Sequence, residues 1–135
     1  MPLLMLDTNI CIYTIKHHPP EVRRRLEAIA PHQAAISSIV AAELWTGVMK
    51  SQRPRQNETA LTEFLNYLPV LDWPAEAAKI YGALRAHLES EEKPIGAMDM
   101  LIAAHALHER AVLVTDNQRE FRRIPGLELE SWVRR

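Results

Sequence analysis

Short apolar segments alternate with longer segments of helical periodicity along this 135-residue chain. Strands are expected where apolar residues run together, and helices where they recur about every three to four positions. The predicted strands cover residues 3–6, 34–36, 69–73, 112–115 and 127–132. The predicted helices cover residues 9–16, 21–29, 39–49, 59–68, 75–89, 98–107 and 119–122. This alternation predicts a succession of strand–helix units.

Prolines and serines mark the boundaries of several predicted helices. Pro20 is placed to open the second helix, because the first helical position needs no backbone N–H. Ser37 and Ser38 occupy the N-cap position of the third helix. Pro54 is expected to end that helical element, since a proline interrupts the hydrogen-bond ladder of a helix.

Strands that alternate with helices over one chain of this length predict an α/β fold. We expect a single domain over residues 1–135, an α/β/α sandwich with a mostly parallel central sheet of about five strands. In such sheets ligands bind beyond the C-terminal strand ends, where the strand order reverses. Asp7 and Asp116 each follow a predicted strand directly, which makes them the first candidate functional residues.

The composition is that of an ordinary globular protein, with 47% apolar and 24% charged residues, and it excludes disorder. Apolar runs are too short to cross a bilayer, so no membrane association is expected. The first seven residues lack the basic start and cleavage site of a signal peptide. The single cysteine, Cys11, excludes an internal disulfide. We therefore expect a cytoplasmic protein.

Arginine dominates the basic residues, accounting for twelve of the sixteen, although the net charge is only −1. The guanidinium group binds phosphate through two parallel hydrogen bonds. The arginines form clusters at 23–25, 53–55, 119–123 and 134–135. These clusters are expected either to contact a phosphate backbone or simply to form solvated helix faces.

Four acidic residues differ from the others because their neighbours are apolar or small: Asp7, Glu43, Asp99 and Asp116. Each acid taken alone is explained as a cap on backbone N–H groups. Glu43 fits that explanation poorly, because its surroundings indicate partial burial and an unpaired buried carboxylate is costly. All four elements begin or end at the same edge of the predicted sheet, so the four acids are expected to converge there.

Clustered carboxylates repel one another and take up protons unless a cation neutralises them. Oxygen ligands favour hard cations, so the predicted metal is Mg²⁺, with Mn²⁺ able to replace it. Such a site activates water and stabilises the leaving oxygen of a phosphodiester. Polar residues that flank the acids are expected to orient them through hydrogen bonds. These residues are Thr8, Asn9, Ser38, Thr115 and Asn117.

With these residues in place, the chain resembles the PIN-domain nucleases and, among them, the VapC toxins of VapBC toxin–antitoxin systems. The resemblance runs the whole length of the chain. It is carried by MLDTN at 5–9, ISSI at 36–39 before Glu43, PIG at 94–96, DMLIA at 99–103, LVTDN at 113–117, REF at 119–121 and IPGL at 124–127.

The resemblance implies an endoribonuclease with a four-acid Mg²⁺ site at Asp7, Glu43, Asp99 and Asp116. Residues 94–103 and 114–125 are similar to the subgroup that cleaves initiator tRNA in its anticodon loop. Met100 departs from that subgroup, in which a polar residue often follows the third acid. The family also implies a homodimer and a cognate VapB antitoxin whose C-terminal segment covers the active site.

Two other functions stay open from the residues themselves. One is a Mg²⁺-dependent phosphatase or phosphotransfer domain with Asp7 as the nucleophile, although the expected lysine at a later strand end is missing. The other is a non-catalytic module of PIN fold that binds RNA or protein. His105 is expected to be a surface or packed histidine rather than a metal ligand, and Cys11 a small buried apolar residue.

Overall fold

A computed structural model describes residues 2–134 of the chain. One five-stranded sheet of order β3-β2-β1-β4-β5 forms the centre, and all of its strand pairs are parallel. The strands are β1 (Leu4–Leu6), β2 (Ala34–Ser37), β3 (Val70–Leu71), β4 (Val112–Val114) and β5 (Glu128–Glu130). The helices are α1 (Thr8–Lys16), α2 (Pro20–Glu27), α3 (Ser38–Met49), α4 (Pro54–Tyr67), α5 (Ala77–Ser90), α6 (Ala97–Glu109) and α7 (Gln118–Phe121), with a 3₁₀ turn at Pro31–Gln33.

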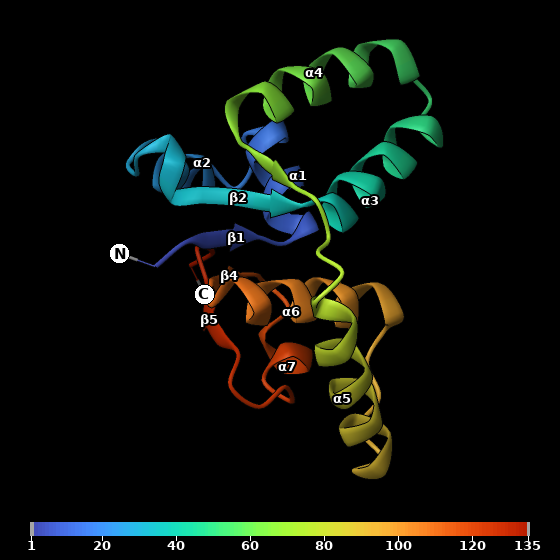
Figure 1. Cartoon of the computed structure of the whole chain (residues 1–135). Helices are drawn as coiled ribbons and strands as arrows, with labels where there is room; N and C mark the ends of the chain where they lie inside the picture. Colours follow the sequence, from blue (N-terminus) through green and yellow to red (C-terminus); the bar gives the residue numbers. More distant parts are fainter. Residues whose placement is uncertain (1, 135) are drawn as a thin grey trace.

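Two groups of helices flank the sheet (Figure 1). The N-terminal group, α1 to α4, lies toward one end of the sheet, and α5, α6 and α7 lie toward the other. α5 and α6 pack against each other and share the most extensive helix–helix contact of the described residues. The α/β fold with a parallel five-stranded sheet predicted from the sequence is therefore confirmed.

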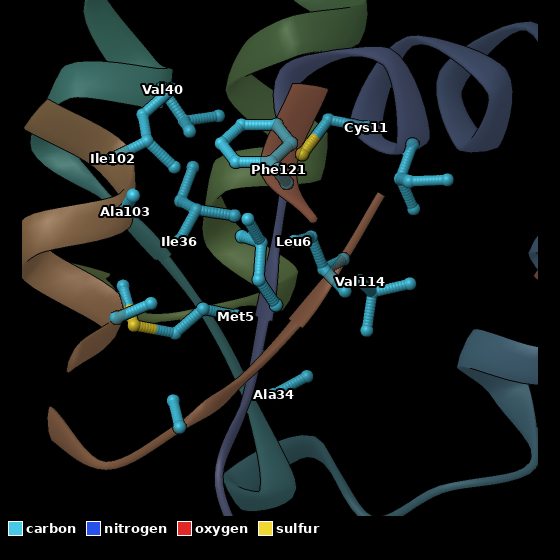
Figure 2. Packing of buried hydrophobic residues seen from close by; sticks show 14 of the residues in the cluster. Met5, Leu6, Cys11, Ala34, Ile36, Val40, Ile102, Ala103, Val114 and Phe121 are labelled. Carbon is cyan, nitrogen blue, oxygen red and sulfur yellow. The ribbon is translucent and has the colours of Figure 1, made fainter. Parts of the chain in front are cut away.

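The core covers both faces of the central strand. Met5 and Leu6 are each 1% exposed, and successive strand residues point to opposite faces, so both faces of β1 are covered. Figure 2 shows these side chains packed with Ile102 of α6 and Phe121 of α7. Cys11 lies in the same core as a free, buried thiol, as predicted.

The prediction for Pro54 was wrong. Pro54 opens α4 instead of ending the preceding helix, and it occupies the first helical position, where a missing N–H costs nothing. Residues 54–58 contain no apolar side chain besides the proline, so the periodicity that marks a helix begins only further along. The third strand is also shorter than predicted, because only Val70 and Leu71 pair with β2.

None of the helices within residues 2–134 is both long and apolar enough to span a membrane.

Candidate active site

The strand order reverses between β1 and β4. From β1 the sheet grows through β2 to β3 on one side, whereas β4 and β5 lie on the other side. This reversal is where open parallel sheets bind their ligands, beyond the C-terminal strand ends. Asp7 follows β1 and Asp116 follows β4 after one residue, so both acids stand at the reversal.

Asp7 is the most buried of the candidate acids, with 4% of its surface exposed. Its Oδ1 accepts a hydrogen bond from the N–H of Thr8 at 2.8 Å, which caps α1. Its Oδ2 accepts one from the hydroxyl of Thr115 at 2.7 Å. Burial and, to a smaller extent, the charge of Glu43 raise the pKa of Asp7, although these two hydrogen bonds counteract the rise.

Glu43 enters the site from α3, on which it is the sixth residue. The helix begins here because the Ser37 hydroxyl accepts the N–H of Ile39 and so forms its N-cap. The Thr8 hydroxyl donates a hydrogen bond of 2.6 Å to Glu43 Oε1. Thr8 thus donates to Asp7 through its backbone N–H and to Glu43 through its hydroxyl. These two hydrogen bonds hold the two carboxylates close to the same residue.

Asp99 lies in the first turn of α6 and is partly buried. Its pKa is raised from 3.8 to about 6, first by burial and then by the negative charges of Asp7, Glu43 and Glu120. The same electrostatic effect shows that these carboxylates lie close enough to repel one another. Gly96 lies next to this carboxylate, where a Cβ would make an ordinary contact of 3.9 Å with Asp99 Oδ2.

Glu120 is a fifth acid at this site that sequence reasoning missed. It lies on α7, and its negative charge contributes to the raised pKa of Asp99. In the sequence it stands next to Arg119 and near Arg122, a polar surrounding typical of a solvated helix face. The position of α7 after β4 was the available indication, because any segment following a strand end reaches the same edge of the sheet.

Asp116 is held differently from the other acids. The Tyr13 hydroxyl of α1 donates a hydrogen bond of 3.2 Å to Asp116 Oδ2. Asp7, Glu43 and Glu120 act electrostatically on Asp99, and Tyr13 holds Asp116 at the same edge of the sheet.

The flanking polar residues differ in what they contact. Thr115 bonds Asp7 and also accepts the backbone N–H of Asn117 at 2.9 Å, which orders the chain after β4. The Ser38 hydroxyl accepts the backbone N–H of Trp73 at 3.0 Å and so ties the start of α3 to the segment after β3. Asn9 is exposed on α1. Of the five predicted flanking residues, Thr8 and Thr115 are thus the two whose side chains bond a candidate acid.

The donor set at this edge fits a hard divalent cation. All its candidate ligands are carboxylates, and after burial it is the negative charges of neighbouring acids that raise the pKa values of Asp7 and Asp99. A cation would relieve the repulsion between these charges. Within residues 2–134, no group of three or more acidic, histidine or cysteine side chains stands in an arrangement that could hold a metal ion without some movement of the side chains.

Residues 4–127 of this chain match the PIN domain, and the protein belongs to the PIN-domain family. In this chain the domain is an α/β fold with acidic residues at the edge of the sheet described above. Among its curated relatives are VapC ribonucleases. It is 49% identical over 131 residues to ribonuclease VapC2 of Rickettsia felis, covering 96% of this chain and 98% of that protein. It is 43% identical over 128 residues to the tRNA(fMet)-specific endonuclease VapC of Shigella flexneri, covering 95% and 96%.

Solved structures give the same result. The crystal structure of VapBC2 from Rickettsia felis, bound to a DNA fragment from its promoter, contains a chain that matches this one with a TM-score of 0.92. The two chains are 48% identical, and the match covers 97% of this chain and 99% of the other. Fold and sequence thus agree on the family along nearly the whole length.

Proposed function

We propose that this protein is the toxin ribonuclease of a VapBC pair and that it hydrolyses phosphodiester bonds in RNA. One observation carries the proposal: Asp7, Glu43 and Asp99 come from three separate elements and repel one another at the reversal of strand order. Such an arrangement costs stability and is explained by a cation-dependent reaction. The curated relatives are ribonucleases, which supports RNA as the substrate.

The cation we propose is Mg²⁺, with Mn²⁺ able to replace it, held by Asp7, Glu43 and Asp99, with Asp116 as a further ligand. When bound, the cation would lower the pKa of water and neutralise charge on the phosphate. Thr8 and Thr115 fix the directions in which Glu43 and Asp7 present their oxygens.

The substrate we propose is tRNA, cut in the anticodon loop of the initiator. The Shigella flexneri relative, named as a tRNA(fMet)-specific endonuclease, supports this choice. Arg119 and Arg122 are exposed on either side of Glu120 in the sequence, where they are suited to bind the phosphates next to the cleaved bond. A tRNA substrate places the reaction in the cytoplasm.

The partner we propose is a VapB-type antitoxin, in agreement with the VapBC complexes among the similar structures. A mostly apolar groove of about 260 Å³ lies between α1, α3 and α4, and Glu43 lines it together with Ile12, Leu44 and Leu61. A peptide segment in this groove would lie against Glu43. We also propose a homodimer, which size-exclusion chromatography with light scattering would test.

The geometry disfavours Asp7 as the nucleophile of a phosphatase. Both of its carboxylate oxygens already accept hydrogen bonds, from Thr8 and Thr115, and the side chain is almost fully buried. The remaining lone pairs of these oxygens suffice to bind a cation, whereas attack on phosphorus also needs a substrate phosphate brought against this almost fully buried side chain. A non-catalytic binding module would have no use for mutually repelling acids, and the cleavage assay below separates it from a nuclease.

The experiment is cleavage of initiator tRNA and of total tRNA by the purified, antitoxin-free protein. Reactions contain Mg²⁺, Mn²⁺ or EDTA, and Asp7→Asn is compared with Glu58→Gln, a variant of an exposed acid on α4. Cuts at discrete sites that need the metal, persist in Glu58→Gln and vanish in Asp7→Asn support the proposal. Failure of the folded wild-type protein to cut any RNA would overturn it.

A further inference from the structure

His105 is a fully buried histidine on α6 that the proposed reaction does not use. Its side chain has 0% exposure, and its Nδ1 lies 2.7 Å from the Ser37 hydroxyl oxygen. These two residues are 68 positions apart in the chain. A buried polar contact between distant segments fixes their relative position more strictly than apolar packing does.

Two contacts favour donation from the Ser37 hydroxyl to His105 Nδ1. The hydroxyl oxygen accepts the N–H of Ile39 at 3.1 Å, while its own hydrogen can point toward Nδ1, and the carboxylate of Glu109 faces the other ring nitrogen. The imidazole then carries its hydrogen on Nε2, which faces Glu109 Oε1 at 3.7 Å. Burial lowers the pKa of His105, in keeping with this neutral form.

A second connection joins the same two parts of the fold. The backbone N–H of Trp73 donates to the Ser38 hydroxyl at 3.0 Å, and its indole Nε1 donates to the carbonyl oxygen of Leu101 at 2.9 Å. Leu101 and His105 lie one turn apart on α6. The start of α3 is therefore tied to α6 at two successive turns.

These ties connect α3 and α6, the helices that carry Glu43 and Asp99. Glu43 lies six residues beyond Ser37 along α3, and Asp99 lies six residues before His105 along α6. Each acid is thus about 9 Å along its helix from the tie. Because Glu43 raises the pKa of Asp99, their separation matters energetically in the fold itself.

We propose that His105 and Trp73 are positioning residues, which set the separation of Glu43 and Asp99 by tying the N-cap of α3 to α6. The two side chains act through Ser37, Ser38 and Leu101 and touch neither acid in any hydrogen bond of the described residues. The consequence for metal binding rests on the function proposed above.

The test compares His105→Leu, which removes the bond to Ser37, with His105→Asn, whose amide oxygen can accept it again. Trp73→Phe removes the indole donor and keeps an aromatic ring, with some loss of volume. Val22→Ala is the control for a general loss of core packing, because Val22 is fully buried on α2, a helix without a candidate acid. Each purified variant is measured by calorimetric titration with Mn²⁺ alone, by kcat and KM for tRNA cleavage, and by urea unfolding.

We expect His105→Leu and Trp73→Phe each to weaken Mn²⁺ binding about tenfold, the size typical of losing a group that orients metal ligands. kcat should fall with KM for tRNA unchanged, because the RNA-binding surface is intact. His105→Asn should recover most of the Mn²⁺ affinity. Val22→Ala should lose stability and keep the wild-type affinity.

Wild-type Mn²⁺ affinity in a folded His105→Leu protein would overturn the inference, as would an equal loss in Val22→Ala. If His105→Leu does not fold, Trp73→Phe decides in the same way. If the wild type itself binds no Mn²⁺, the proposed metal site fails. In that case the positioning role is judged by a double-mutant cycle of Glu43→Gln and Asp99→Asn, which measures the coupling free energy between the two acids. This coupling free energy should be smaller in a Trp73→Phe background. An unchanged coupling free energy would overturn the positioning role.

Discussion

Removing the charge of Asp99 should stabilise the metal-free protein above pH 6. The pKa of this carboxyl rises from 3.8 to about 6 on folding, chiefly because the folded chain buries it and places Asp7 and Glu43 nearby. A group whose pKa is raised in the fold favours folding below its unfolded pKa and loses that contribution as the pH rises through the folded value. The free energy of unfolding of the wild type should therefore fall between pH 4 and pH 7. In Asp99→Asn, the decrease that comes from Asp99 should be absent.

The magnitude follows from the shift. One pKa unit corresponds to about 1.4 kcal/mol, so the shift sets a ceiling of about 3 kcal/mol. The Asp99 carboxyl is only partly buried, and solvent screening reduces this to about 1–1.5 kcal/mol. For a domain of this size, that corresponds to a rise of about 4 °C in Tm at pH 8.

The assay is urea unfolding of wild type and Asp99→Asn in EDTA at pH 4.5 and pH 8. At pH 4.5, just above the unfolded pKa, the variant should exceed the wild type by only about a third of the difference expected at pH 8. Adding Mn²⁺ at pH 8 should reverse the order, because only the wild type keeps the full set of carboxylates. Equal differences at both pH values, or a less stable variant at pH 8 in EDTA, would refute the electrostatic reasoning.

Three further predictions concern neighbouring groups. Glu120→Gln should lower the pKa of Asp99 below about 6, because it removes one of the charges that raise this pKa. Carbon NMR titration of the metal-free protein measures the pKa, and an unchanged value would contradict the placement of Glu120. Tyr13→Phe should reduce kcat/KM about fivefold through loss of the bond to Asp116, and it should have no added effect in an Asp116→Asn background, which a double-mutant cycle tests. The Cys11 thiol, whose pKa burial raises well above its ordinary range, should stay unreactive toward a disulfide reagent at pH 8 and react fully in urea; rapid reaction of the native protein would contradict its burial.

Much of the site was predictable because its acids are marked by local pattern. A short apolar run followed by a carboxylate identified Asp7 and Asp116 as strand-end residues, and parallel strands bring such ends to one edge of the sheet. Glu43 and Asp99 were distinguished by apolar neighbours that make a solvated role costly. The residue types alone then indicated a hard cation.

Other contacts depend on how distant segments pack, which a local pattern does not contain. The bond from Thr115 to Asp7 joins residues 108 positions apart, and that from His105 to Ser37 joins residues 68 apart. Glu120 resembled an ordinary solvated glutamate until α7 placed it beside Asp99. The sequence by itself determined the order of strands and helices along the chain and the edge at which the acids gather, because those follow from periodicity and parallel topology. Only the tertiary structure decided which side chains orient those acids, since such hydrogen bonds exist only once the elements have packed.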